Sequence, residues 1–79
     1  MKQKVIEICK KGSSGKISVD AFYDSLRAIA DDSRTDDDLA CLLEDALMDL
    51  EMEHDSGSSK SALQKLVKET SEIILEELE

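Results

Sequence analysis

Proline and tryptophan are both absent from this sequence, and Phe22 and Tyr23 are its only aromatic residues. Ala, Leu, Glu, Lys and Asp are abundant, whereas residues that favour strands are scarce. Because sheets draw on β-branched and aromatic side chains, this balance predicts an all-α protein. A chain of 79 residues buries only a modest core, so residues 1–79 are expected to form a single helical domain.

Cysteine is scarce as well, with only Cys9 and Cys41, and His54 is the lone histidine. No Cys-x-x-Cys pair and no zinc-ligand spacing occurs, and two cysteines are too few for a disulfide framework. Both are expected to behave as small apolar residues in a reducing compartment. The sequence also has no signal-peptide core and no apolar run of about 18 residues, which predicts a soluble, cytoplasmic protein.

Basic residues are outnumbered by acidic ones, 10 against 19, which gives a formal net charge of −9. Phosphate backbones and anionic lipids attract Lys and Arg, so this charge argues against direct binding to nucleic acid or membranes. It favours a basic protein partner, which would associate rapidly through electrostatic steering. The alternative is that the acids only keep a small protein soluble.

Two helices are predicted in the N-terminal half of the chain. The first spans residues 2–11, and Gly12 is placed to end it, with a flexible loop over residues 12–16. Ser18 is a good N-cap for the second helix, with Asp20 in its first turn. Apolar residues in that helix recur at intervals of three and four, as one stripe of a helix requires: Val19, Phe22, Leu26, Ile29 and Ala30.

Two further helices are predicted in the C-terminal half. The third is capped by Thr35, ends near Glu53, and has an inward stripe of Leu39, Leu42, Leu43, Ala46, Leu47 and Leu50. The fourth begins at Ser59 or at Ser61, which forms a capping-box pattern with Gln64, and runs almost to the end of the chain. Short connections between such stripes predict a compact four-helix bundle.

Metal-binding and catalytic patterns are incomplete. Residues 15–22 resemble the end of an EF-hand loop, but the calcium-ligand positions fall on Lys10, Gly12, Ser14 and Ala21, which supply no carboxylate. No metal site, and no specific calcium binding, is therefore expected. No serine or cysteine has an adjacent histidine to activate it, so the chain is not expected to be an enzyme or to carry a cofactor.

The third predicted helix has a second apolar strip opposite its leucines. At 100° per residue, Cys41, Met48 and Met52 fall together on that side, with acidic residues beside them. An apolar strip rimmed by acids is typical of a protein-binding surface. The candidate partner-binding residues are Asp37, Asp38, Glu44, Asp45, Met48, Glu51 and Met52. The alternative is a helix buried on two sides, with the methionines against the fourth helix.

The segment Ile17-Ser18-Val19-Asp20-Ala21-Phe22, followed by Leu26, resembles the turn-and-helix opening of colicin D-type and related contact-dependent-inhibition immunity proteins. Members of that family are small, helical and acidic, and they neutralise a tRNA-cleaving toxin by covering its basic active-site cleft. The likeness covers about a dozen residues together with size and charge. It implies an acidic helical inhibitor and assigns no individual contact residue.

The leading hypothesis is therefore an immunity protein or antitoxin that binds a basic, nuclease-type toxin and blocks its active site. The alternative is a regulatory adaptor that docks on another basic protein through its acidic helix. A third reading comes from Asp24-Ser25-Leu26, which resembles the attachment triplet of acyl carrier proteins. Ser25 is predicted to lie inside the second helix, whereas in that family the serine opens a helix.

Overall fold

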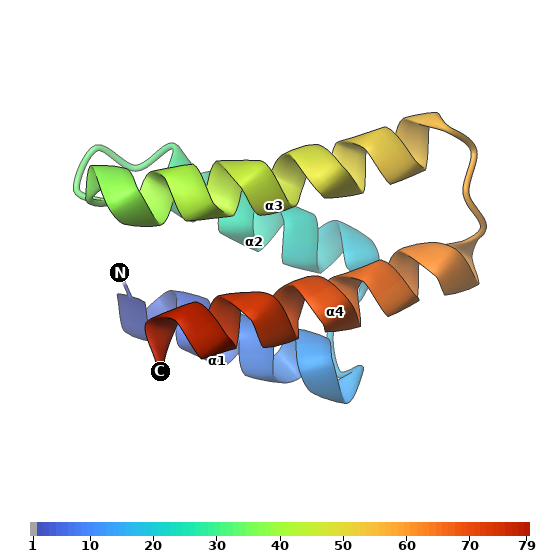
Figure 1. Ribbon diagram of the computed structural model, residues 1–79, viewed down its shortest axis with the longest axis horizontal. Helices are drawn as coiled ribbons and strands as arrows, with labels where there is room; N and C mark the ends of the chain where they lie inside the picture. Colours follow the sequence, from blue (N-terminus) through green and yellow to red (C-terminus); the bar gives the residue numbers. More distant parts are fainter. Residues whose placement is uncertain (1) are drawn as a thin grey trace.

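The computed structural model of the protein describes residues 2–79 and contains four α-helices and, within that range, no strand. The helices are α1 (Lys2–Ser14), α2 (Val19–Ala30), α3 (Asp37–Asp55) and α4 (Lys60–Leu78). Successive helices run in opposite directions, which makes an up-down-up-down bundle with both ends of the chain at the same end of the molecule (Figure 1). The predicted four-helix architecture is confirmed.

The four helices pack as two close pairs, α1 with α4 and α2 with α3. In Figure 1, α3 and α4 lie in front, with α2 and α1 behind them. Every helix contributes to one core, and the largest fully buried side chains are Phe22, Leu26, Leu43, Leu47, Ile74 and Val5. The predicted apolar stripes of α2 and α3 therefore do face inward.

The N-cap of α2 is the residue that its sequence predicts. Ser18 Oγ accepts a hydrogen bond from the Ala21 N–H at 3.2 Å and so satisfies one of the free donors in the first turn. The prediction for α3 was wrong by one residue, because Asp36 caps it and Oδ1 of Asp36 accepts from the Leu39 N–H at 3.0 Å. Thr35 is buried, and its hydroxyl donates to the Ile29 carbonyl oxygen at 2.6 Å.

The structure fixes the end of α3 and the start of α4, which the sequence placed only approximately. Helix α3 continues two residues past Glu53, to Asp55. Ser59 caps α4 by accepting from the Ala62 N–H at 3.2 Å, which selects the first of the two predicted starts. The capping box of Ser61 with Gln64 is wrong, because both residues lie inside the helix.

The sequence predicts that α1 ends at Gly12. In the structure Gly12 instead lies buried within that helix. Helix α1 runs on to Ser14, and Gly15 adopts the left-handed conformation that follows it, with φ of 74°. A Cβ atom at Gly12 would lie 2.2 Å from Ser71 Oγ and 2.9 Å from Cε1 of Phe22. Gly12 thus allows α1 to approach α4 and the Phe22 ring closely, a packing role that local sequence does not reveal.

Substituting alanine for Gly12 is expected to destabilise the protein by about 1–2 kcal/mol. Overpacking a filled core costs about 1–3 kcal/mol, and the better helix propensity of alanine offsets about 1 kcal/mol at most. Ser71→Ala alone is expected to be nearly neutral, since Ser71 Oγ is buried without a hydrogen-bond partner among residues 2–79. The double variant Gly12→Ala/Ser71→Ala should recover at least half of the lost free energy of unfolding, measured by urea denaturation. No recovery would show that the Ser71 hydroxyl is not the group that the added Cβ atom clashes with.

Candidate functional site

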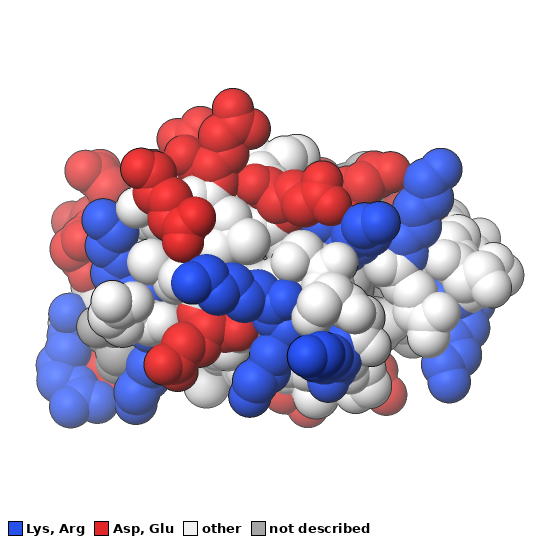
Figure 2. Space-filling view, turned by 90° about the horizontal axis from the view of Figure 1, so that it is seen from below, with Lys and Arg blue, Asp and Glu red and all other residues white. Residues whose placement is uncertain are grey.

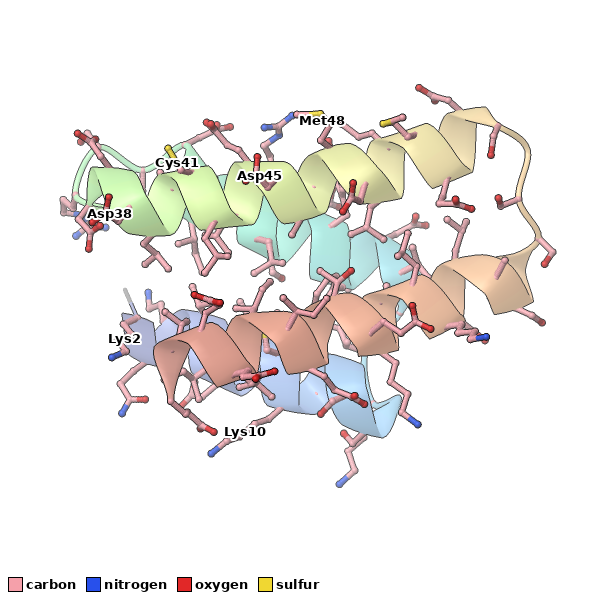
Figure 3. All side chains as sticks on the ribbon, in the orientation of Figure 1. Lys2, Lys10, Asp38, Cys41, Asp45 and Met48 are labelled. Carbon is pink, nitrogen blue, oxygen red and sulfur yellow. The ribbon has the colours of Figure 1, made fainter. Side chains whose placement is uncertain are left out.

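The second apolar strip of α3, consisting of Cys41, Met48 and Met52, faces solvent; we call it the outer α3 strip. Met48 is 53% exposed, Met52 is 64% exposed, and Cys41 is exposed as well. Figure 3 shows Cys41, Asp45 and Met48 on the side of α3 that points away from α4. The alternative prediction, that the methionines pack against the fourth helix, is therefore wrong. Helix α3 is buried on one side only.

Four of the predicted acidic residues, Asp37, Asp38, Glu44 and Asp45, are exposed beside this strip. Asp37 and Asp38 lie in the first turn of α3, where the helix dipole favours negative charge. None of the four forms an ion pair with another residue in the described part of the chain. Their carboxylates are therefore available to a cationic partner without breaking an internal contact.

Glu51 differs from the other predicted residues because internal contacts engage it. It is half-buried, its Oε1 accepts a hydrogen bond from the Tyr23 hydroxyl, and Arg27 Nη2 lies 3.2 Å from the same oxygen. The Arg27 guanidinium also sits over the Tyr23 ring, 5.8 Å from its centroid. The hydrogen bond to Glu51, followed by burial, raises the pKa of Tyr23. Glu51 thus ties α3 to α2.

Sequence reasoning missed Tyr23 and Arg27. Their spacing does indicate a contact between the two side chains. The only tyrosine is followed four residues later by the only basic residue of α2, which places both on one helix face. The acid that they meet lies 28 residues away from Tyr23 in the chain. No local pattern distinguishes Glu51 from the acidic residues around it.

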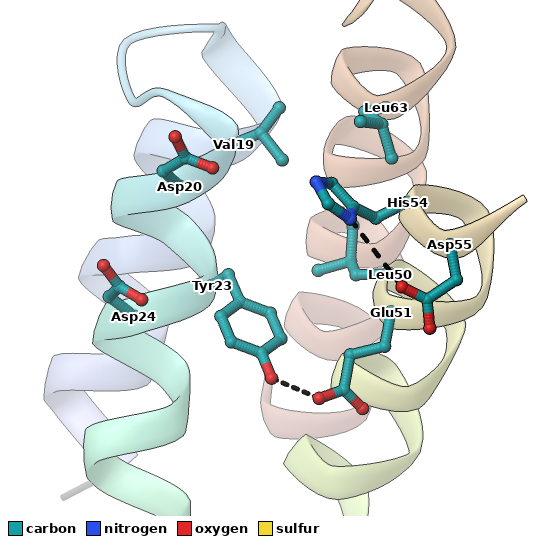
Figure 4. Close-up of a pocket in the computed structure, with 9 residues that line it drawn as sticks. All are labelled: Val19, Asp20, Tyr23, Asp24, Leu50, Glu51, His54, Asp55 and Leu63. Atoms are coloured by element: carbon teal, nitrogen blue, oxygen red, sulfur yellow. Dashed lines mark hydrogen bonds and ion pairs between the residues drawn. The ribbon is translucent and has the colours of Figure 1, made fainter. Parts of the chain in front are cut away.

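A groove of about 390 Å³ lies between α2 and α3 at the end of the bundle where α4 begins; we call it the α2–α3 groove (Figure 4). Val19, Leu50 and Leu63 supply its apolar lining. Its other lining residues are polar and come from α2 and α3: Asp20, Tyr23, Asp24, Glu51, His54 and Asp55. Figure 4 shows Tyr23 reaching across from α2 to Glu51 at one end of the groove.

The residues considered for metal binding, catalysis and carrier attachment lie apart from one another among residues 2–79. No three His, Cys, Asp or Glu side chains there are grouped so that they would hold a metal ion. His54 is exposed, and its Nδ1 lies 3.8 Å from Oδ1 of Asp55. Ser25 lies half-buried in the middle of α2, as predicted, rather than at a helix start.

The two cysteines occupy opposite environments, which makes their reactivity a direct test of the packing. Cys9 is fully buried, and burial raises the pKa of its thiol to about 12, whereas Cys41 is exposed on α3. Because the thiolate is the reactive form, one thiol per chain is expected to react with a disulfide reagent in the folded protein and two after denaturation. Cys41→Ser should abolish the fast reaction; rapid labelling of that variant would contradict the burial of Cys9.

Charge is distributed unevenly over the bundle. Residues 1–17 contain five lysines and one acid, whereas residues 31–55 contain eleven acids and Arg34 as their only Lys or Arg. Seen from below, where α1 and α4 lie, the surface shows basic side chains among acidic and uncharged ones (Figure 2). The acidic excess therefore belongs to α3 and the segment before it.

No helix among residues 2–79 combines the length and the apolar character needed to cross a bilayer. Comparisons of the chain with models of known protein families, with curated proteins and with solved structures found no match. The resemblance to immunity proteins therefore stays a prediction, and the surface chemistry of the chain itself provides the grounds for a function.

Proposed function

We propose that this protein is a non-enzymatic inhibitor that binds a basic protein through the outer α3 strip and the acids beside it. The exposure of Met48 and Met52, on a helix whose leucine stripe is already buried, carries the proposal. Two large flexible apolar side chains in solvent suit adaptable contacts at an interface. The unpaired carboxylates around them supply charge complementarity to Lys and Arg.

More specifically, we propose that the protein is a cytoplasmic immunity protein or antitoxin whose partner is a nuclease-type toxin. A nuclease active site is lined with cationic side chains that bind the phosphate groups of the substrate. Carboxylates such as those of Glu44 and Asp45 would occupy the positions of these phosphate groups. The net charge of −9 supports rapid association with such a surface.

The experiment starts from the gene next to the one that encodes this chain. Its product would be purified and assayed for RNA and DNA cleavage while the chain is added in increasing amounts. Complete inhibition at a one-to-one ratio is expected. A tight partner without nuclease activity would instead favour the second candidate, a regulatory adaptor, which the same acidic surface supports. A phosphopantetheine group on Ser25, detected by mass spectrometry, would favour a carrier protein.

Met48→Ala is expected to raise the dissociation rate from the partner roughly fivefold or more, equivalent to about 1 kcal/mol, while the association rate changes little. The substitution removes apolar contact area and no charge. Ile73→Ala is the matched control, because Ile73 is also an exposed apolar side chain, 59% exposed, but lies on α4. Surface plasmon resonance on both variants checks the result, and equal effects would place the interface elsewhere.

A further inference from the structure

The α2–α3 groove has the chemistry of a subsite for one basic side chain. Its apolar lining includes Leu50 and Leu63, which belong to the buried interior, and Val19. Such a lining suits the aliphatic stem of Lys or Arg, which packs on apolar surface while its charged end remains near solvent. The volume of about 390 Å³ lies in the range of sites that bind small groups.

Acidic residues on both walls give the groove its charge. Asp20 and Asp24 lie four residues apart on α2, and Glu51 and Asp55 lie four residues apart on α3. Like charges at this spacing repel each other on a helix, and no Lys or Arg lines the groove. Asp20 and Asp24 form no ion pair within residues 2–79. A cation between the walls would relieve the repulsion between Asp20 and Asp24. By contrast, Arg27 already offsets part of the charge of Glu51.

The protein's own Arg27 indicates which cation fits. Its guanidinium lies over the Tyr23 ring and contacts the Glu51 carboxylate, so this corner already holds the planar group through two kinds of contact. Guanidinium is more weakly hydrated than ammonium and binds carboxylates through two parallel hydrogen bonds. These properties favour arginine over lysine beside an apolar lining.

We propose that the α2–α3 groove binds an arginine side chain of the basic protein partner. The inference rests on the proposed function in one respect, that the partner is a basic protein. It adds a second contact region on the α2 side of α3, separate from Met48, Met52 and the acids on the outer face. The partner would then contact α2 as well as α3.

The test uses the full-length chain, labelled with ¹⁵N, and an acetylated tetra-arginine amide as the probe at physiological salt. Amide shift changes are expected to concentrate at the groove walls, around Asp20, Asp24 and Glu51. Asp20→Asn/Asp24→Asn is expected to weaken binding of the peptide roughly tenfold, from the loss of two exposed charge pairs. A tetra-lysine peptide is expected to bind several times more weakly than tetra-arginine.

Glu72→Gln/Glu76→Gln is the matched control. It removes two exposed acids that lie four residues apart on α4, outside the groove, and so changes the net charge equally. Shift changes spread over all acidic surfaces, equal weakening by the two double variants, or equal affinity for tetra-lysine would each overturn the arginine subsite. Thermal unfolding of each variant confirms that the fold is retained.

The outcomes also separate this inference from the proposed function. If the peptide leaves the groove unchanged while charge reversal at Glu44 and Asp45 still slows association with the partner, the groove inference is overturned and the proposed function stands. If the peptide binds in the groove while those reversals have no effect on the partner, the groove is supported and the outer face of α3 is not the interface.

Discussion

Phe22→Ala is expected to remove a large share of the stability of this protein, about 3–5 kcal/mol. Phe22 is fully buried, is the only phenylalanine, and packs against α1 at Gly12. Because Gly12 has no side chain that could move into the space, the cavity would remain largely open. A domain of this size has a total stability of only about 4–12 kcal/mol, so the substitution would remove between about a quarter of that stability and all of it.

Urea denaturation followed by circular dichroism would measure the loss. Ile73→Ala is again the control, since trimming an exposed apolar side chain is expected to change stability by less than about 0.5 kcal/mol. A loss below about 1 kcal/mol for Phe22→Ala would mean that the ring is not in the core, and the packing of α2 against α1 would then be wrong.

Reversing the charges of Glu44 and Asp45 to lysine is expected to slow association with the basic partner by on the order of tenfold or more. Both residues are exposed and form no internal ion pair, so the fold should be unaffected. Exposed charges are screened over about 10 Å at 0.1 M salt and about 3 Å at 1 M. The difference from the unsubstituted protein should therefore shrink as salt is raised in stopped-flow measurements.

The control for this variant is Glu69→Lys/Glu72→Lys on α4, where both residues are exposed. Each double variant replaces two negative charges by two positive ones, so each changes the net charge from −9 to −5. Equal slowing by both would mean that overall charge, rather than a site on α3, controls association. No effect of either would remove α3 from the interface.

Local signals were sufficient to predict the helices and one of their caps. Ser18 caps α2 because its hydroxyl needs only the N–H three residues ahead, and the apolar stripe of that helix depends on spacing alone. Where two candidates stood side by side, local signals were less decisive. Thr35 and Asp36 are both good caps, and the choice followed from burial of Thr35, which lets its hydroxyl reach the Ile29 carbonyl.

The composition and the apolar periodicity by themselves determined that this protein is helical, that its helices number four, and that α3 has acids around a second apolar strip. These properties follow from interactions within a few residues of chain. The tertiary structure alone decided that Met48 and Met52 face solvent, that Glu51 is engaged by Tyr23 and Arg27, and that Gly12 lies inside α1. Each depends on a neighbouring helix, whose approach is set by packing of the whole core rather than by the residues nearby in sequence.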